Sequence, residues 1–454
     1  MKKLPIVAIV GRANVGKSSL FNTILRSREA IVAREAGTTR DSIMQKAEYK
    51  HQNFWLVDTA GMKNPEDDFE FTIQEQIEQA SDSADVIWVV VEADVAINED
   101  DRRVAKMALR SKKPVVLVIN KIDKAKGIDL AIFKRLGIKE IIETSSTQSR
   151  GIEALLDNLI QVIPKVTLKE SDDKLHVAII GRPNVGKSQL FNALAKKQQA
   201  IVADRAGTTR DINRATVRFE GRDIEIMDTA GIRRQSKIDR GVEHFSVIRT
   251  LSAIEQADIC LLLMDVNELN VALDQKIAGI VKDAGKGLVL VVSKWDAVQG
   301  KDAYTRDALA PQIANTYDFV PWAPLIFTSA VTGQNVSDIF KLLLEIEEHR
   351  KTRIKTTELN RWLREAVDKH PPAGLKSRMP KLNYIVQEND NPMPAFKIFG
   401  SQTKFIHWSY RRYLERELRS RYNFEGSALQ LWFIEKHVAH KHGVRPGAEV
   451  TKGE

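Results

Sequence analysis

The sequence predicts an α/β protein with two similar domains in tandem, followed by a smaller α+β domain. The first observation is a repeat: GRANVGKSSLFN at Gly11–Asn22 returns as GRPNVGKSQLFN at Gly181–Asn192. The stretch AIVAREAGTTRD at Ala30–Asp41 returns as AIVADRAGTTRD at Ala200–Asp211, and the DTAG that begins at Asp58 returns at Asp228, each 170 residues later. A period of this length indicates duplicated domains, because solenoid repeats run to about 20–50 residues.

The second observation is the alternation of strands and helices inside each copy. In the first copy, short apolar runs at Ile6–Val10, Phe54–Val57, Val86–Val91 and Val115–Ile119 predict strands, with helical segments between them. Near-continuous apolar runs are typical of strands that are buried on both faces of a parallel sheet. We therefore expect each copy to form a doubly wound, mostly parallel sheet, which binds ligands at the carboxyl ends of its strands.

The third observation is a change of pattern near the C-terminal end. Apolar residues at helical spacing predict a helix around Leu359–Val367 that ends before Pro371. The segments that follow predict strands at Lys381–Glu388 and Ala395–Phe399, a helix with Tyr410 and Leu418 on its apolar face, and a strand at Leu429–Ile434. This order, αββαβ, is that of a small α+β domain.

These patterns divide the chain into five parts. We expect the first α/β domain at residues 1–165, a polar linker at 166–174 and the second α/β domain at 175–349. The small α+β domain follows at 350–436, and the polar tail 437–454 is expected to be disordered.

The composition indicates the cellular compartment and the kind of partner. Cys260 is the one cysteine of the 454 residues, which predicts a reducing compartment, the cytoplasm. The longest apolar runs, such as Val86–Val91 and Ile259–Met264, are far shorter than the ~20 residues of a membrane span. We expect a monomer without membrane association. The net charge is +9, whereas residues 350–454 alone carry +10, which predicts a polyanionic partner or a basic tail that aids solubility.

Two phosphate-binding loops carry the chemistry. GRANVGKS and GRPNVGKS both fit G-x-x-x-x-G-K-[ST], in which backbone N–H groups surround phosphates at a helix N-terminus. Lys17 and Lys187 are expected to reach the β- and γ-phosphates. Because each loop follows a strand and precedes a helix, we interpret both as P-loops.

The companion motifs predict a magnesium site and a guanine pocket. Ser18, Thr39 and Asp58 are the expected Mg²⁺ ligands of the first copy, and Ser188, Thr209 and Asp228 are those of the second. The aspartates of NKID and SKWD, Asp123 and Asp296, can accept hydrogen bonds from guanine N1–H and the 2-amino group, which adenine does not offer. The chain is therefore expected to bind GTP and GDP.

Taken together, these motifs resemble those of the translation-factor-like P-loop GTPases. The tandem arrangement with a small basic third domain resembles the Der (also called EngA) family of bacterial ribosome-assembly GTPases, over nearly the whole chain. The third domain of that family is KH-like without the usual GxxG loop, and residues 350–436 contain no GxxG either. The resemblance implies GTP hydrolysis and association with the large ribosomal subunit and its rRNA during maturation.

The expected nucleotide-binding residues follow from the motifs in each copy. In the first copy they are Gly11, Arg12, Ala13, Asn14, Val15, Gly16, Lys17, Ser18, Thr39, Asp58, Thr59, Ala60, Gly61, Met62, Asn120, Lys121, Ile122, Asp123, Ser145 and Ser146. In the second they are Gly181, Arg182, Pro183, Asn184, Val185, Gly186, Lys187, Ser188, Thr209, Asp228, Thr229, Ala230, Gly231, Ile232, Ser293, Lys294, Trp295, Asp296, Ser329 and Ala330.

The residue after DTAG raises a catalytic question. Many GTPases carry a glutamine there to orient the attacking water, whereas this chain has Met62 and Ile232. Asn14 and Asn184 match the asparagine that ligates K⁺ in related potassium-activated GTPases. K⁺ beside the phosphates would stabilise the developing charge; the alternative is that the asparagine only shapes the loop.

Ser293 replaces the asparagine that usually connects the base pocket to the phosphate loop. We therefore predict loss of that hydrogen bond and weaker nucleotide binding in the second copy.

Three arginines of the third domain are candidate RNA contacts. Arg412, Arg416 and Arg419 are expected opposite the apolar face of the last helix, where they contact rRNA or are simply exposed to solvent.

Three functions compete at this stage. The first is a GTPase switch in assembly of the large subunit, and the second is an RNA-binding assembly scaffold whose G domains mainly sense nucleotide. A GTPase of tRNA modification is the third. It would need a folate- or cysteine-bearing domain, which the single Cys260 argues against.

Overall fold

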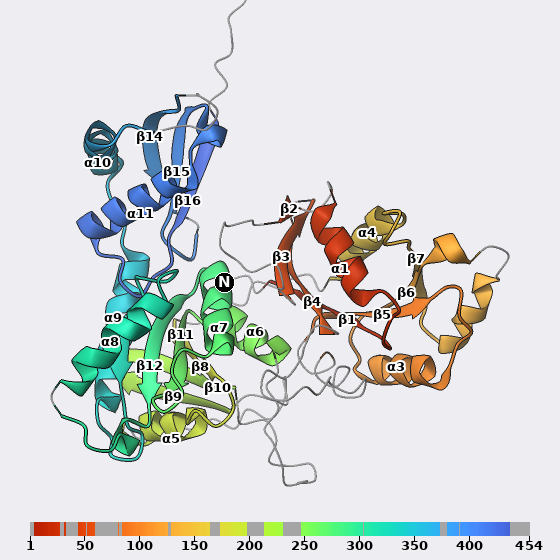
Figure 1. Cartoon of the computed structure of the whole chain (residues 1–454), viewed down its shortest axis with the longest axis horizontal. Coiled ribbons are helices and arrows are strands. Elements are labelled where there is room, and N and C mark those ends of the chain that lie inside the picture. The colour runs from red at the N-terminus through yellow and green to blue at the C-terminus, as the bar shows by residue number, and fades with distance from the viewer. Residues whose placement is uncertain are drawn as a thin grey trace, which may run out of the picture. The chain divides into compact units, whose positions relative to one another are not determined.

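A computed structural model gives the structure of the chain (Figure 1). It describes residues 4–27, 31–32, 44–50, 52–59, 80, 84–125, 129–163, 173–197, 213–229, 247–302, 304–372, 379–389 and 391–435. The chain divides into two compact units, Met1–Arg350 with Phe424–Ala428 and Lys351–Asn423 with Leu429–Glu454. The expected tail, and all but the last two residues of the expected linker, lie outside the described ranges.

The first copy forms a mixed sheet in the strand order β2-β3-β4-β1-β5-β6-β7. Strand β1 is parallel to β4 and β5, and β3 is antiparallel to β4. The described elements are β1 (Ile6–Val10), α1 (Lys17–Arg26), β2 (Ile31–Val32), β3 (Met44–Tyr49), β4 (Gln52–Asp58), β5 (Val86–Glu92), α3 (Glu99–Arg110), β6 (Val115–Asn120), the 3₁₀ segments η2 (Ile122–Lys124) and η3 (Leu130–Leu136), β7 (Glu140–Glu143) and α4 (Ile152–Val162).

The central strand β1 is buried on both faces, because helices cover the sheet on each side. Ile6, Ala8 and Val10 belong to the core that includes α3, whereas Val7 and Ile9 belong to the core that includes α1 and α4. Figure 1 shows α1 and α4 on one face of the sheet and α3 on the other. The apolar run of β1 is unbroken because both faces of this strand are buried, as predicted for a doubly wound sheet.

The second copy repeats this architecture. Its sheet has the order β13-β12-β11-β8-β10-β9, and β9 is the antiparallel edge strand. The described elements are β8 (Leu175–Gly181), α5 (Lys187–Lys197), β9 (Asn213–Phe219), β10 (Arg222–Asp228), α6 (Val247–Gln256), β11 (Ile259–Asp265), α7 (Ala272–Asp283), β12 (Gly287–Ser293), η5 (Trp295–Ala297), α8 (Thr305–Thr316), β13 (Leu325–Phe327) and α9 (Val336–Lys351).

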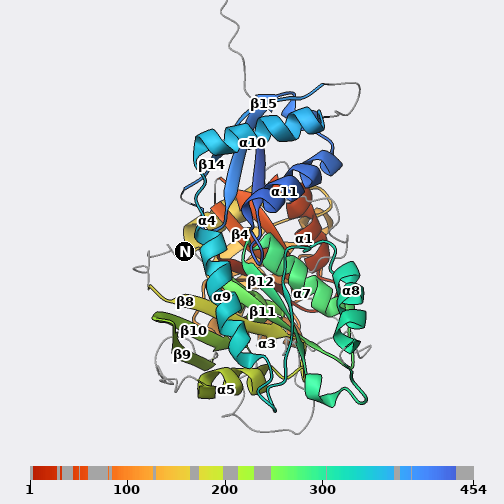
Figure 2. The same ribbon diagram turned by 90° about the vertical axis from the view of Figure 1, so that its left-hand side faces the viewer.

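The third domain has the predicted order αββαβ. Its elements are α10 (Thr356–Lys369), β14 (Lys381–Gln387), β15 (Ala395–Ser401), η6 (Thr403–Phe405), α11 (Trp408–Tyr422) and β16 (Gln430–Glu435). Strand β15 lies in the middle, antiparallel to β14 and parallel to β16. Figure 2 shows α10 and α11 side by side on the sheet. The predicted fold class, two P-loop α/β domains and a small α+β domain, is confirmed.

The topology brings the sequence motifs to one edge of each sheet. In the first copy the phosphate loop follows β1, Asp58 ends β4, and Asn120 ends β6. Asp228 and Ser293 end β10 and β12 in the second copy. None of the helices in the described part of the chain combines the length and the apolar character of a membrane span.

Candidate functional site: two nucleotide-binding sites

A phosphate loop joins the first strand to the first helix of each copy. Gly16 and Gly186 precede the helices with φ of 94° and 95°, in the left-handed region that favours glycine. Helices α1 and α5 begin directly after them, at Lys17 and Lys187. The N–H groups of the first helical turn therefore face the loop, where the helix dipole favours an anion. Both loops have the geometry that phosphate binding requires.

The loop lysines are buried and held by the loop itself. Lys17 is 4% exposed, and its Nζ donates to the carbonyl oxygens of Gly11 and Arg12, at 2.7 Å each. Lys187 is 7% exposed, and its Nζ donates to the carbonyl oxygen of Arg182 at 2.5 Å. The ammonium groups are thus kept inside the loops, in position for a phosphate.

A hydroxyl and a carboxylate meet beside each loop. Ser18 Oγ donates to Asp58 Oδ2 at 2.5 Å, and Ser188 Oγ donates to Asp228 Oδ2 at 2.9 Å. These are the hard oxygen ligands that Mg²⁺ prefers, and Mg²⁺ commonly takes only one or two protein ligands beside substrate phosphates and water. The residues present therefore fit Mg²⁺.

The threonines of the two DTAG motifs connect neighbouring strands by hydrogen bonds. Thr59 is fully buried, and its hydroxyl donates to the carbonyl oxygen of Ile9 at 2.6 Å. Thr229 makes the equivalent bond to Ile179 at 2.9 Å. These bonds fix the carboxyl ends of neighbouring strands, so the carboxylates stay next to the loops. Eight other predicted site residues lie outside the described ranges: Thr39, Ala60, Gly61, Met62, Thr209, Ala230, Gly231 and Ile232.

Asn120 connects three parts of the first site. Its side chain is 1% exposed, and Nδ2 donates to the carbonyl oxygen of Val15 in the phosphate loop at 3.0 Å. Its Oδ1 accepts from the Ser146 backbone N–H at 3.2 Å and from Ser146 Oγ at 2.9 Å. One amide thus holds the phosphate loop and the loop after β7 to the end of β6.

Ser293 keeps one of these two connections. Its Oγ lies 2.6 Å from the carbonyl oxygen of Val185 and 3.0 Å from that of Met264, and its single hydroxyl hydrogen serves one of them at a time. The prediction that serine loses the bond to the phosphate loop is therefore wrong, because Oγ is close enough to reach it. What is lost is an acceptor for the following loop. Among the described residues nothing accepts a hydrogen bond from the Ala330 N–H, whereas the Ser146 N–H donates to Asn120 Oδ1.

The two base-pocket aspartates are held in the same way. Ser145 Oγ donates to Asp123 Oδ1, and Ser329 Oγ donates to Asp296 Oδ1, at 2.5 Å each. The hydrogen bond from Ser145 lowers the pKa of the Asp123 carboxyl, which therefore stays ionised at neutral pH. An ionised, oriented carboxylate is an acceptor for two neighbouring N–H donors, which guanine provides.

Other residues of the predicted sites act through packing or backbone. Val15 and Val185 are buried in the cores beneath the loops, and Trp295 packs edge-on against Phe327 at 4.8 Å. Lys121 Nζ donates to the carbonyl oxygen of Asn14 at 2.8 Å and to Glu92 Oε1, and Lys294 Nζ donates to Asp265 Oδ2 at 2.6 Å. Ala13 is exposed, whereas Pro183 and Ile122 are half-buried.

Comparison with known proteins gives the family. A family model described as a 50S ribosome-binding GTPase matches residues 6–121 and again residues 176–294. A second model, described as the C-terminal KH-domain-like domain of EngA bacterial GTPase enzymes, matches residues 353–433. The protein named GTPase Der of Chloroflexus aggregans is 42% identical over 439 residues, which cover 94% of this chain and 97% of that protein.

Two further relatives agree. The GTPase Der of Thermomicrobium roseum is 40% identical over 449 residues, covering 95% of this chain and 96% of that protein. That of Gemmatimonas aurantiaca is 39% identical over 431 residues, covering 94% and 98%. The chain belongs to the Der family of GTPases. It therefore binds guanine nucleotides and hydrolyses GTP.

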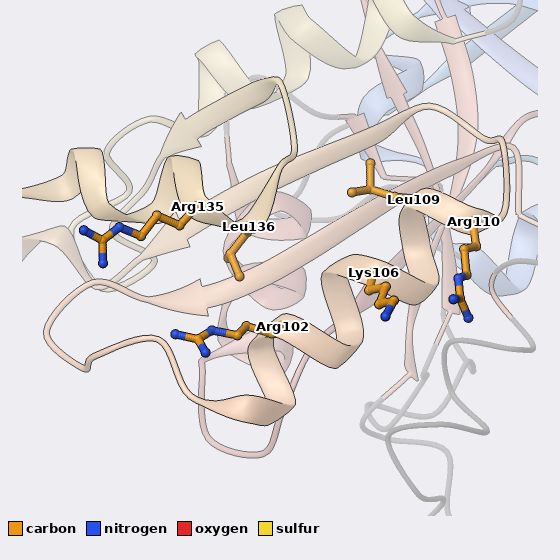
Figure 3. A pocket seen from close by; sticks show the side chains of 6 residues that line it. All are labelled: Arg102, Lys106, Leu109, Arg110, Arg135 and Leu136. Carbon is orange, nitrogen blue, oxygen red and sulfur yellow. The ribbon is translucent and has the colours of Figure 1, made fainter.

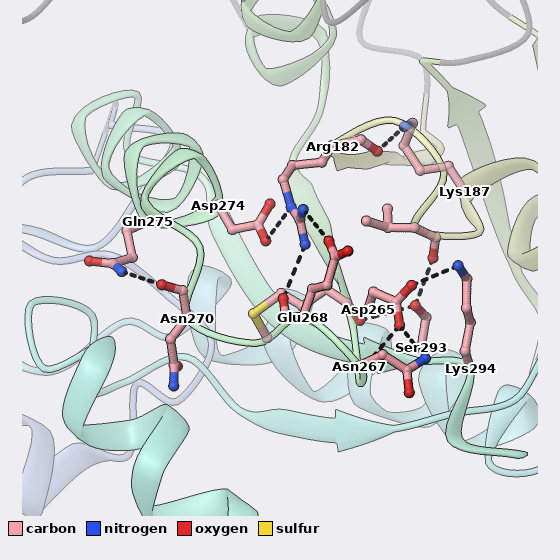
Figure 4. A network of polar contacts seen from close by, with 12 residues as sticks. Arg182, Lys187, Asp265, Asn267, Glu268, Asn270, Asp274, Gln275, Ser293 and Lys294 are labelled. Atoms are coloured by element: carbon pink, nitrogen blue, oxygen red, sulfur yellow. Dashed lines mark hydrogen bonds and ion pairs between the residues drawn. The ribbon is translucent and has the colours of Figure 1, made fainter. Parts of the chain in front are cut away.

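In this Der-family chain an arginine anchors each phosphate loop to a helix, and Figure 4 shows this contact for Arg182 in the second copy. Arg182 Nε donates to Asp274 Oδ2 at 3.0 Å, and its Nη1 donates to Glu268 at 2.8 Å. Asp274 is fully buried on α7, and burial raises its pKa to about 6, although Arg182 favours the ionised form. Arg12 has the equivalent partner Asp101 on α3, at 3.4 Å.

The sequence prediction included both arginines but missed their aspartates. The signal was present in the sequence, because Asp101 and Asp274 are separated by 173 residues, as are Asn120 and Ser293. Matching positions in two copies of a Der-family domain indicate a shared role. Here that role is to hold the second residue of the phosphate loop.

The third domain holds two of its three predicted RNA contacts on its surface. Arg412 and Arg416 are exposed, and the Arg412 guanidinium lies 4.8 Å from the ring centre of Trp408. The Arg419 side chain is only 14% exposed, and its Nη2 lies 2.9 Å from Glu415 Oε1. Arg419 is therefore not the exposed contact that was predicted, because most of its side chain is buried and its guanidinium is paired with Glu415.

Proposed function

We propose that this chain is a nucleotide-dependent switch in the assembly of the large (50S) ribosomal subunit. We also propose that it works as a monomer in the cytoplasm, with domains at 1–165, 175–349 and 350–436. The observation that carries the proposal is the joining of two sets of guanine-nucleotide motifs to a C-terminal part, residues 350–454, with an excess of +10 charges. The description of the matching family model as a 50S ribosome-binding GTPase supports the same partner.

Within each site the residues have distinct proposed roles. Lys17 and Lys187 bind the β- and γ-phosphates, because each ammonium group already lies inside its loop. Ser18 and Asp58, like Ser188 and Asp228, hold Mg²⁺. When bound, Mg²⁺ neutralises charge that develops on the phosphates.

The ribosomal proposal is tested by sedimentation with purified 50S and 30S subunits. The full chain is loaded with GDP or with a non-hydrolysable GTP analogue, and its share in each subunit fraction is measured. We expect nucleotide-dependent binding to 50S and little binding to 30S. Equal binding in both nucleotide states, without stimulated GTP turnover, would favour the RNA-binding scaffold.

We further propose that K⁺ activates hydrolysis through Asn14 and Asn184. Both asparagines are exposed on the phosphate loops, with φ of 65° and 62°. A cation there would stabilise charge at the reacting phosphate. We expect GTP turnover to be at least about tenfold faster in K⁺ than in Na⁺.

The substitutions Asn14→Gly and Asn184→Gly separate this role from loop shaping. Glycine adopts the same positive φ but has no side-chain oxygen. Loss of the K⁺ response in the double variant, with nucleotide binding retained, supports ligation. If the response persists, the asparagines only shape the loops.

Arg412 and Arg416 remain our proposed RNA contacts in the third domain, and Arg419 is no longer one. The stacking of Arg412 on Trp408 leaves its donors available for a phosphate. Replacement of Arg412 and Arg416 by glutamine should reduce binding to 50S subunits in the same sedimentation assay.

A further inference from the structure

A basic hollow lies on the first G domain, away from its nucleotide site. It has a volume of about 450 Å³ and lies between α3 and the 3₁₀ segment η3. We name it the α3 basic groove, and its lining residues are Arg102, Lys106, Leu109, Arg110, Arg135 and Leu136. Figure 3 shows Leu136 directed toward α3, which carries the first four of these side chains.

Four cations line this groove and none of its lining residues is acidic. In the described part of the chain, Arg102, Lys106, Arg110 and Arg135 have no ion pair or hydrogen bond through their side chains. Their positive charges are therefore not neutralised by neighbouring carboxylates. The first turn of α3 carries Glu99, Asp100 and Asp101, and Asp129 caps η3, but none of these carboxylates lines the groove.

The cations of α3 form one row. Arg102, Lys106 and Arg110 follow one another at intervals of four residues, so they lie on one side of the helix. The row extends over roughly 12 Å at 1.5 Å per residue. That length corresponds to about three phosphates of one strand, at ~3.4 Å of axis for each.

The second G domain provides an internal comparison. Helices α3 and α7 have the same length and occupy the same place in their domains, 173 residues apart. The buried aspartate that anchors the phosphate loop is retained in both, as Asp101 and Asp274. The cationic row is not: the residues of α7 at its three positions are Gln275, Gly279 and Asp283.

Comparison of the two copies therefore separates the residues that the fold requires from the cations that are found only in the first of the two helices. A helix with a glutamine, a glycine and an aspartate at these positions still forms and still holds its phosphate loop. The cations of α3 are not required for packing, because their side chains are exposed. They also lie in the part of the chain, before residue 350, whose total charge is close to zero.

The chemistry of the groove favours a nucleic-acid backbone over a small ligand or a base. Its charges are on long flexible side chains, and its lining contains no glycine of the kind that forms phosphate-binding loops. It contains no aromatic residue on which an unpaired base could stack. Leu109 and Leu136 offer apolar surface along which the methylene groups of Arg and Lys can pack.

We propose that the α3 basic groove binds the phosphate backbone of structured RNA. The inference rests on the proposed function, which supplies a ribosomal partner, and adds a contact on the first G domain to that of the third domain. Binding there depends on backbone shape and charge rather than on base sequence. Because the second copy lacks the row, the two G domains would meet RNA differently.

The test compares two full-length variants with the same loss of charge. The groove variant carries Arg102→Gln, Lys106→Gln and Arg110→Gln. The control variant carries Lys196→Gln, Lys276→Gln and Lys341→Gln, which remove three exposed lysines of the second G domain. Circular dichroism and GDP affinity should match the wild type for both variants, since neither set touches the nucleotide sites.

Affinity for an RNA duplex of arbitrary sequence is then measured at several salt concentrations. We expect the groove variant to bind roughly tenfold or more weakly, with a slope of log K against log[salt] reduced by about two to three. The control should keep the slope of the wild type. If groove and control variants bind the duplex equally, the inference is wrong.

Sedimentation with 50S subunits distinguishes this failure from failure of the proposed function. A wild-type chain that does not bind 50S at all contradicts the proposed function, whatever the duplex result. If the groove variant loses 50S binding but binds the duplex with an unchanged slope, the groove takes an acidic protein segment instead of RNA. That result would also overturn the inference.

Discussion

At the scale of single residues, the position of Asn120 and Ser293 gives the two nucleotide sites different hydrogen bonds. Asn120 holds both the phosphate loop and the loop after β7, whereas Ser293 reaches only the phosphate loop. The shorter side chain also leaves room: a Cβ on Gly16 would lie 2.4 Å from Asn120 Nδ2, but one on Gly186 would meet nothing closer than 3.6 Å. At this position the second site therefore lacks one hydrogen-bond acceptor and has free space next to Gly186.

The first prediction follows from that space. Ser293→Asn should fit beside Gly186 and supply an acceptor for the Ala330 N–H, as Asn120 does for Ser146. We expect GDP to bind the second site about fivefold more tightly, corresponding to about 1 kcal/mol for one hydrogen bond. The measurement is equilibrium GDP binding by the full chain with Lys17→Ala, which silences the first site.

Ser293→Ala is the control for this prediction. Alanine fills a similar volume but cannot donate to Val185, so GDP affinity should fall relative to serine. An asparagine variant that binds no better than wild type would show that the lost acceptor does not limit affinity.

The second prediction compares the glycines before the helices. Gly16→Ala and Gly186→Ala both place an alanine at positive φ, at a cost of about 1–2 kcal/mol. Only Gly16→Ala also creates a clash with Asn120, so it should weaken GDP binding much more than Gly186→Ala. GDP titration of each site, with the other silenced, measures the difference.

Adding Asn120→Ser to Gly16→Ala should recover most of that difference. Serine takes the position that Ser293 has in the second copy, and the clash disappears. No recovery would mean that the two glycines differ for another reason.

At the scale of elements, α3 and α7 combine two independent surfaces. One side of each helix holds the phosphate loop through an arginine and a buried aspartate. The side that bears the basic row in α3 is free to diverge, and α7 lacks these cations. Duplication thus kept the contact on which the nucleotide site depends and changed the surface.

The third prediction concerns Asp274 and pH. Its pKa is about 6 in the fold and about 3.9 when unfolded, so the folded chain binds an extra proton between these values. The free energy of unfolding should therefore fall as pH rises from about 4 to 6, by roughly 3 kcal/mol from this group. Asp274→Asn cannot titrate and should lack this component.

Denaturant unfolding of wild type and Asp274→Asn at pH 4.5 and pH 7 measures the effect. The control is Asp307→Asn on α8, whose carboxylate is 63% exposed. Parallel pH profiles for wild type and Asp274→Asn would contradict the assignment of a raised pKa to Asp274.

At the scale of the whole molecule, a short segment of the C-terminal part belongs to the compact unit that contains the two G domains. Residues Phe424–Ala428 lie between α11 and β16 in the sequence but belong to the unit of the two G domains. Gly426 accepts from the Leu288 N–H at 3.0 Å and donates to the Trp322 carbonyl at 2.7 Å. This short segment therefore closes the start of β12, inside the second G domain.

The fourth prediction tests this closure with Gly426→Ala. Gly426 has φ of 72°, and an added Cβ would lie 2.2 Å from Ile346 Cγ1 in the buried core. We expect destabilisation by about 2–4 kcal/mol from backbone strain and overpacking. Thermal unfolding and limited proteolysis of the full chain should show an earlier transition.

Gly300→Ala is the matched control, since φ is 64° and nothing lies within 4 Å of the added Cβ. It should cost only the backbone component, about 1–2 kcal/mol. Equal effects at both glycines would mean that the docking of Gly426 on Ile346 contributes little.

The sequence by itself determined the duplication, the order of strands and helices, and the positions of the phosphate loops. These features depend on residues that are close in sequence: a repeat, an apolar run or a motif such as DTAG at Asp58. The buried strand β1 was predictable because its pattern reflects burial on both faces.

Only the tertiary structure decided which distant side chains meet. Ser293 reaches Val185 across 108 residues, and Arg182 reaches Asp274 across 92. The inward position of Arg419 and the groove between α3 and η3 were equally invisible in the motifs. The physical reason is that side-chain reach and burial depend on how elements pack, which the local pattern of one element does not contain.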